Sequence, residues 1–151
     1  MYPARTTYHL AHTLADYKAC HAFFRAEAQH PTCKAENGEF PEYVTEKIQS
    51  PTVIARRNAQ VIGVAASRMA PRWGLVGNPI HVAYDIKNHV PTLLRLLQRY
   101  LAALAKVGET HISFVVPNWK PSVPKIFEKL YGARLFRQAL NGRYNIYIIE
   151  L

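Results

Sequence analysis

Cysteine is scarce in this sequence, and Cys20 and Cys33 are the only two in 151 residues. Two thiols cannot supply the disulfide framework of a small secreted domain, so we predict a reducing, cytoplasmic setting. Long apolar runs are also missing, and no window approaches the roughly 18 residues of a membrane-spanning helix. The N-terminal MYPARTTYHLAH is interrupted by Arg, Thr and His, so we expect no signal peptide and no membrane partner.

Acidic residues are few: Asp and Glu number 10 against 19 Lys and Arg, which gives a formal net charge of +9. This excess favours anionic partners, whether phosphorylated cofactors, nucleic acid or acidic surfaces, and does not choose among them. Hydrophobic residues make up 49% of the chain and charged residues 19%, which excludes a disordered protein. The length predicts a single domain over residues 1–151.

Hydrophobic periodicity and turn residues divide the chain into strands and helices. We predict strands at 5–12, 52–56, 61–69, 78–86 and 110–116, and two more around Asn141-Gly142. We predict helices at 13–28, 41–49, 92–106 and 123–130, with a polar loop at 30–40. Strands and helices mix without strict alternation, which predicts an α/β domain with a mixed, mostly antiparallel sheet and helices on both faces.

Particular residues mark the ends of these elements. Thr13 and Asp16, three residues apart, form a capping-box pattern at the start of the first helix. Gly108 ends the helix over 92–106, the most strongly periodic in the chain. Asn141-Gly142 is the strongest short signal for a β-hairpin.

Two stretches resemble the general N-acetyltransferase (GNAT) superfamily. VIARRNAQVIGVAASRM (53–69) is similar to the hairpin formed by the second and third strands of that family. THISFVVPNWKPSVPKIFEKLYGARLFRQ (110–138) is similar to its fifth strand, the Asn that follows, and the helix before strand six. The style of the chain also looks like that of small GNAT-like proteins encoded by tailed bacteriophages. The resemblance covers nearly the whole chain and implies acetyl-CoA in a splay between strands four and five, with acyl transfer to an amine.

The cofactor-binding residues follow from the same resemblance. In the family, an Asn at the end of strand five commonly faces the cofactor, and Asn118 stands at that position here. It could equally be a turn former after the strand. The Gly-rich loop that usually holds the pyrophosphate is missing, because no Gly lies between Gly77 and Gly108. Lys87, Asn88 and His89 remain, at a helix N-terminus that could hold an anion or simply be capped.

Acid and base candidates are weaker. Many members of the family carry a Tyr in the last helix that protonates the leaving thiolate, whereas Phe127 stands there in this chain. Tyr131, four residues later, is the replacement candidate. His81 and Asp85 on the fourth strand are the candidates for accepting the proton of the amine. His81 could instead be a half-exposed strand residue, and Asp85 an ion-pair partner near Lys87.

Two further clusters of residues have simpler structural interpretations. His30-x-x-Cys33 matches no strong ligand spacing, so we expect no metal. Arg56, Arg57, Arg68 and Arg72, with Trp73 nearby, suggest nucleic-acid binding or, more simply, a solvated strand edge.

Two hypotheses of different class remain open. The first is an acetyl-CoA-dependent N-acyltransferase acting on an unidentified amine. The second is a catalytically inactive GNAT-fold protein that binds a protein partner, for example as a virion-associated or host-interaction component if it is encoded by a phage. The stretch over 110–138 favours the first hypothesis, and the missing Gly loop and Phe127 favour the second.

Overall fold

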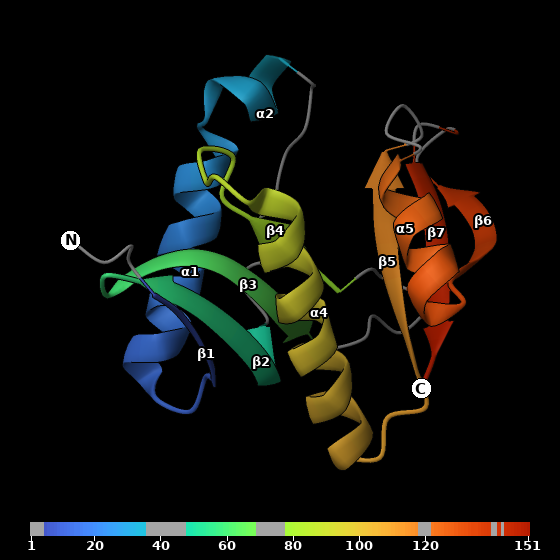
Figure 1. Ribbon diagram of the computed structural model, residues 1–151, viewed down its shortest axis with the longest axis horizontal. Coiled ribbons are helices and arrows are strands. Elements are labelled where there is room, and N and C mark those ends of the chain that lie inside the picture. Colours follow the sequence, from blue (N-terminus) through green and yellow to red (C-terminus); the bar gives the residue numbers. More distant parts are fainter. Residues whose placement is uncertain (1–4, 36–47, 69–77, 118–121, 140–141, 143) are drawn as a thin grey trace. The chain divides into compact units, whose positions relative to one another are not determined.

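The computed structural model describes residues 5–35, 48–68, 78–117, 122–139, 142 and 144–151 (Figure 1). The strands are β1 (Thr6–Leu10), β2 (Ile48–Arg57), β3 (Gln60–Arg68), β4 (Ile80–Val82), β5 (His111–Pro117), β6 (Arg134–Ala139) and β7 (Tyr144–Glu150). The helices are α1 (Leu14–Ala28), α2 (Pro31–Ala35), α4 (His89–Lys106) and α5 (Ser122–Tyr131). The chain divides into two compact units, Met1–Met69 with Ile80–Ala102, and Ala70–Pro79 with Ala103–Leu151.

The sheet of the first unit has the strand order β1-β2-β3-β4, with every neighbouring pair antiparallel. Asn58 and Ala59 join β2 to β3, and both have positive φ, 52° and 63°. Two successive positive φ angles are typical of the tight hairpin turn whose twist matches that of the strands. The hairpin expected over residues 53–69 is therefore confirmed.

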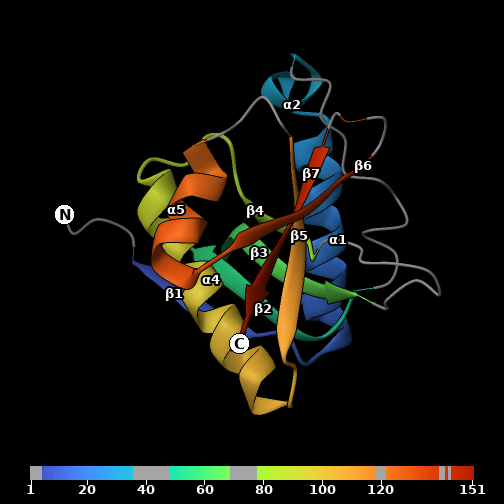
Figure 2. The ribbon, with the colours of Figure 1, turned by 90° about the vertical axis from the view of Figure 1, so that its right-hand side faces the viewer.

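Helices cover both faces of this sheet, as predicted, and Figure 2 shows α1 on one side of β2 and β3 and α4 on the other. On the α1 face, Phe23 and Phe24 pack with Ile54 and Val64. On the α4 face, a Cβ added to Gly63 would lie 3.3 Å from a methyl group of Leu96. The absence of a side chain at Gly63 thus lets α4 approach β3 closely.

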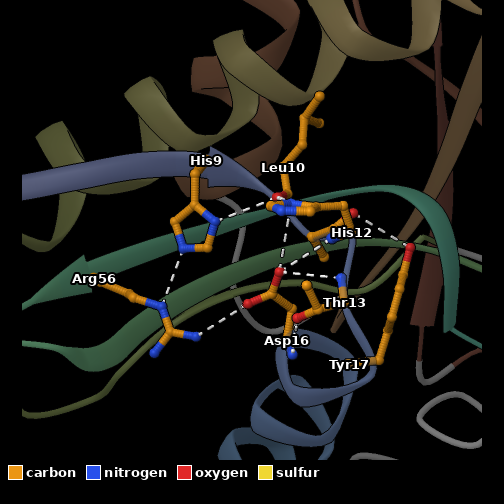
Figure 3. A network of polar contacts seen from close by, with 8 residues as sticks. His9, Leu10, His12, Thr13, Asp16, Tyr17 and Arg56 are labelled. Carbon is orange, nitrogen blue, oxygen red and sulfur yellow. Dashed lines mark hydrogen bonds and ion pairs between the residues drawn. The ribbon is translucent and has the colours of Figure 1, made fainter.

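The start of α1 confirms the predicted capping box. The Thr13 hydroxyl accepts the N–H of Asp16 at 3.1 Å, and Asp16 Oδ2 accepts the N–H of Thr13 at 3.3 Å. Figure 3 shows the Asp16 carboxylate between this turn and Arg56 of β2, whose guanidinium lies 3.6 Å from Oδ1. The Arg56 Nε–H donates to His9 of β1 at 3.0 Å. The network links α1 to β1 and β2.

The sheet of the second unit has the order β5-β7-β6, again antiparallel. The Phe127 ring of α5 meets Phe114 of β5 edge to face at 5.0 Å, and Phe114 stacks on Tyr147 of β7 at 5.7 Å. The predicted hairpin between the last two strands is confirmed, with Gly142 at φ 79°. Asn141 lies outside the described residues.

Several predicted boundaries were wrong. The predicted loop contains the short helix α2, and Ile48 and Gln49 of the predicted helix 41–49 belong to β2, while residues 41–47 lie outside the described residues. The fourth strand is limited to β4, because the Ile86 N–H donates to the Ala83 carbonyl and closes a turn. α4 begins three residues before the predicted Thr92, because the first turn of a helix tolerates Pro91.

Single-domain organisation over 1–151 and a splay between the fourth and fifth strands stay predictions. β4 belongs to the first unit and β5 to the second. Within the second unit, the Asn78 N–H donates to the Ser113 carbonyl of β5 at 2.7 Å. Asn78 is therefore hydrogen-bonded within the second unit.

Candidate functional site

Five of the predicted site residues lie within nine positions, from the end of β4 to the start of α4. They are His81, Asp85, Lys87, Asn88 and His89. All five belong to the first unit. They lie on β4, on the turn after it and at the start of α4. Two of them contact residues at or just after the C-terminal end of α1.

His81 is held by a carboxylate from α1. Its Nε2 lies 2.9 Å from Oε1 of Glu27, and both side chains are 12% exposed. The same oxygen of Glu27 accepts the N–H of Tyr84 at 2.8 Å. The His81 ring also packs on Phe23 of α1, at 5.7 Å between centroids. His81 is thus a largely buried, hydrogen-bonded side chain, not the half-exposed strand residue of the alternative interpretation.

The environment of Glu27 favours its ionised form. Burial raises the pKa of Glu27 and is the largest single influence, but the hydrogen bonds from His81 and the Tyr84 N–H lower it. The neighbouring charges of His81 and His30 act in the same direction, so the pKa of Glu27 lies below its ordinary value of 4.5. A carboxylate that is ionised at neutral pH can only accept hydrogen bonds.

Asp85 lies in the turn after β4 and pairs with a second histidine. Its Oδ1 lies 2.9 Å from Nε2 of His30, and the Asp85 side chain is 85% exposed. The expectation of an ion pair near Lys87 is replaced by this pair with His30. The Tyr84 ring lies beside both imidazoles, with centroids 4.9 Å from His30 and 4.8 Å from His81. The two histidines that are paired with carboxylates therefore lie beside the same tyrosine ring.

Asn88 takes a conformation usual for glycine. Its φ is 61°, in the left-handed region that Asn tolerates better than most residues. Its carbonyl accepts the N–H of Thr92 at 3.2 Å and the Thr92 hydroxyl at 3.0 Å, so Asn88 caps α4. Without a Gly in this stretch, Asn88 supplies the sharp backbone turn.

The start of α4 has some of the groups that an anion-binding site needs. His89 and Val90 contribute backbone N–H groups to its first turn, while Pro91 has none. The His89 Nε2 lies 3.1 Å from the Val82 carbonyl, so this ring is engaged with β4. Lys87 is exposed. The helix dipole and the Lys87 charge suit a phosphate, with fewer amide donors than a Gly-rich loop would give.

The remaining site predictions fall in the second unit. Tyr131 is the last residue of α5 and is partly exposed. Phe127, at the position of the family's tyrosine, is 3% exposed and belongs to the core. Asn118 lies outside the described residues. No contact in the structure tests the roles of these residues or of His81 and Asp85, which stay predictions.

The residues that the sequence reasoning missed are Glu27 and Tyr84. Glu27 sits 54 positions from His81 in sequence, on a helix whose pattern shows only which face is buried. In the sequence, the position of His30 indicates no more than a weak metal pattern with Cys33. The signal that could have drawn attention to Glu27 is a carboxylate one turn before His30 at the end of an amphipathic helix.

Two of the four arginines in the basic cluster of the sequence have partners in the structure. Arg56 pairs with Asp16, and Arg57 donates to the Thr6 hydroxyl at 2.9 Å. Among the residues described, no group of three or more His, Cys, Asp or Glu side chains could hold a metal ion. No helix in the described ranges is long and apolar enough to cross a membrane. Arg72 and Trp73 lie outside the described residues.

A shallow surface pocket on the second unit contains none of the predicted residues. Its lining is Thr110, His111, Arg134, Phe136, Ile148, Glu150 and Leu151. The Arg134–Glu150 ion pair, 2.6 Å long, joins the edge strand β6 to β7 beside it.

Comparison with known proteins defines the fold. No protein-family model and no curated protein sequence matches the chain. Solved structures do match: a GNAT-family acetyltransferase from Staphylococcus aureus Mu50 has a TM-score of 0.69 at 10% identity, covering 97% of this chain and 99% of the other. The ribosomal-protein-S18-alanine N-acetyltransferase from Escherichia coli has a TM-score of 0.62 at 16% identity, with 97% and 93% covered. PaiA N-acetyltransferase from Thermoplasma acidophilum, in complex with coenzyme A, has 0.64 at 13%, with 97% and 99% covered.

These neighbours show that the chain is an α/β protein with the architecture of acetyltransferases over nearly its full length. The chain therefore has the GNAT fold. The fold prediction is therefore confirmed. A bacteriophage origin stays a prediction.

Proposed function

We propose that this chain is an acetyl-CoA-dependent N-acyltransferase acting on an amine. The observation that carries the proposal is the polar cluster at the end of β4, where a largely buried His81 is hydrogen-bonded to a carboxylate in a GNAT fold. A coenzyme A complex of a structural neighbour, PaiA N-acetyltransferase, supports the choice of cofactor. An amine needs a base before it can attack a thioester, and a buried imidazole suits that task at neutral pH.

Each residue of the cluster has a proposed role. Acetyl-CoA, when bound, supplies an acetyl thioester. Lys87 and the backbone N–H groups at the start of α4, shaped by Asn88, would hold its phosphates. His81 accepts a proton from the amine, and Asp85 is the second candidate for this role. His89 supports the cradle by fixing its first turn to β4. Asn118 as a cofactor contact and Tyr131 as the acid remain expectations from the family resemblance.

Calorimetric titration of acetyl-CoA into the purified protein tests the proposal. Because part of the phosphate cradle is missing, we expect a dissociation constant nearer millimolar than micromolar, a difference of about 4 kcal/mol. Lys87→Ala should weaken binding further, and the exposed Lys106→Ala provides a control of equal charge change. Absence of binding at millimolar acetyl-CoA would contradict the proposal.

A second candidate is a GNAT-fold protein without catalysis that binds a protein partner. The observation in its favour is Phe127, which is buried against Phe114 and has no proton to give. A virion-associated role and binding to nucleic acid belong to this alternative. Mass spectrometry of a mixed amine panel incubated with acetyl-CoA separates the two candidates. Only the acyltransferase yields products that are about 42 Da heavier, which is the mass added when an acetyl group replaces a hydrogen.

A further inference from the structure

Glu27 is the carboxylate bound to His81 in the function proposed above, where no chemical role is assigned to it, and it makes two contacts at the candidate base. Its Oε1 accepts the Tyr84 N–H at 2.8 Å and lies 2.9 Å from Nε2 of His81. One oxygen of Glu27 therefore binds both the His81 side chain on β4 and the backbone N–H of Tyr84, just after that strand. Because Glu27 is on α1, that helix fixes both the imidazole and the turn.

The hydrogen-bond chemistry assigns the proton positions on His81. An ionised Glu27 accepts hydrogen bonds and donates none, so His81 Nε2 carries the hydrogen in their 2.9 Å contact. In the neutral imidazole the basic lone pair then lies on Nδ1. We infer that Glu27 is a positioning residue that fixes the tautomer and orientation of His81, so that Nδ1 receives the proton of the amine.

The proton and electron balance is simple. One proton of the ammonium passes to Nδ1 of His81, and the electron pair left on the nitrogen forms the bond to the acyl carbon. The carbon–sulfur bond breaks with its electron pair going to the sulfur, and the thiolate takes up the second proton that the nitrogen loses as the amide forms. His81 is left as an imidazolium beside the Glu27 carboxylate. The attraction between the two charges is stronger than in water because both side chains are only 12% exposed.

The other titratable groups around His81 have different partners or positions. Tyr84 contacts the imidazole ring from the turn, edge on. Asp85, from the same turn, pairs with His30, which precedes α2. The exposed Asp85 carboxylate is screened by water, whereas the Glu27 carboxylate is not. Of these two carboxylates, Glu27 is therefore the one that is hydrogen-bonded to His81 and shielded from water.

This inference rests on the proposed function, and Glu27→Gln tests it with a readout that needs no activity. Glutamine keeps an oxygen for the Tyr84 N–H and removes the charge. Nitrogen NMR of the His81 ring should show hydrogen on Nε2 in the wild type, and a titration midpoint roughly one pH unit lower in E27Q. Glu109→Gln, an exposed site after α4, is the matched control and should leave the midpoint unchanged.

The pH profile of acetyl transfer is the second readout. In E27Q, the rise in kcat should move to lower pH with the His81 midpoint, and the plateau should fall roughly tenfold, because a weaker base accepts the proton less well. KM for acetyl-CoA should not change. Hydrogen on Nδ1 in the wild type, or an unchanged midpoint in E27Q, would overturn the inference; the first measurement needs no folded variant. The expected NMR result without acetyl transfer would refute the proposed function and leave the Glu27–His81 pairing supported.

Discussion

Pro91 removes one backbone donor from the place where a phosphate would bind. The Thr92 N–H is used by the Asn88 carbonyl at 3.2 Å, so position 91 is the last of the first turn whose amide would face outward. A backbone N–H that reaches a phosphate oxygen makes a charge-assisted hydrogen bond of about 1.5–3 kcal/mol. Pro91→Ala restores this donor at the positive end of the helix dipole.

The variant should therefore gain function. If the start of α4 holds the pyrophosphate of coenzyme A, P91A should tighten its binding by roughly tenfold to hundredfold. Pro91 is exposed, and alanine suits a helix, so the free energy of unfolding should fall by at most about 1 kcal/mol. Isothermal titration and a thermal melt on the same protein measure both quantities.

A ligand-based control separates phosphate binding from other effects. Pantetheine has the thiol arm of coenzyme A and no phosphates, so its affinity should be the same for P91A and the wild type. Raised salt should reduce the gain for coenzyme A, because the added interaction involves a charge. A folded P91A with unchanged affinity for coenzyme A would show that α4 does not hold the pyrophosphate.

Three further predictions concern the fold and the acid. The pKa of Asp16 is lowered, chiefly by the His12 N–H, so the ionised carboxylate stabilises the fold above its ordinary pKa of 3.8 and this contribution is lost as the pH falls. Asp16→Asn should therefore lower the free energy of unfolding by about 0.5–1 kcal/mol at pH 7, and the difference from the wild type should shrink in acid. Urea unfolding at several pH values measures both effects. Asn88→Ala should lose about 1 kcal/mol because of its positive φ, and Asn88→Gly should not; equal losses would contradict the conformational explanation. Tyr131→Phe should lower kcat without lowering the melting temperature if Tyr131 is the acid, whereas Phe127→Ala should lose about 3–5 kcal/mol as a core substitution.

The sequence predicted most of the fold because its signals are local. The Thr13–Asp16 capping box spans one turn, and the Asn58 hairpin spans a few residues, so neighbours in sequence carry the physical cause. α2 was missed because five residues give too short a periodic pattern. Its assignment depends on tertiary contacts, as shown by Cys33, which is 1% exposed.

The candidate site was only half predictable. The turn residues His81 and Asp85 could be found by their position after a strand, but their partners Glu27 and His30 are 54 and 55 positions away. Helical periodicity tells which face of α1 is buried and not which side chain reaches across it. Asn88 illustrates the same limit, because a left-handed Asn and an ordinary helix-capping Asn look identical in sequence.

The interleaving of the two units has a consequence for how the chain is made. Neither unit is a continuous stretch: the first ends at Ala102, and the second takes Ala70–Pro79 and resumes at Ala103. A ribosome releases the chain from its N-terminus at roughly 5–20 residues per second, so the first unit has all its residues while the second still lacks its sheet. The hydrogen bond between Asn78 and Ser113 must wait for β5 to emerge. The nascent protein therefore passes through a stage in which all residues of β4 and α4 have emerged but Ser113, which accepts the Asn78 N–H in the folded chain, has not.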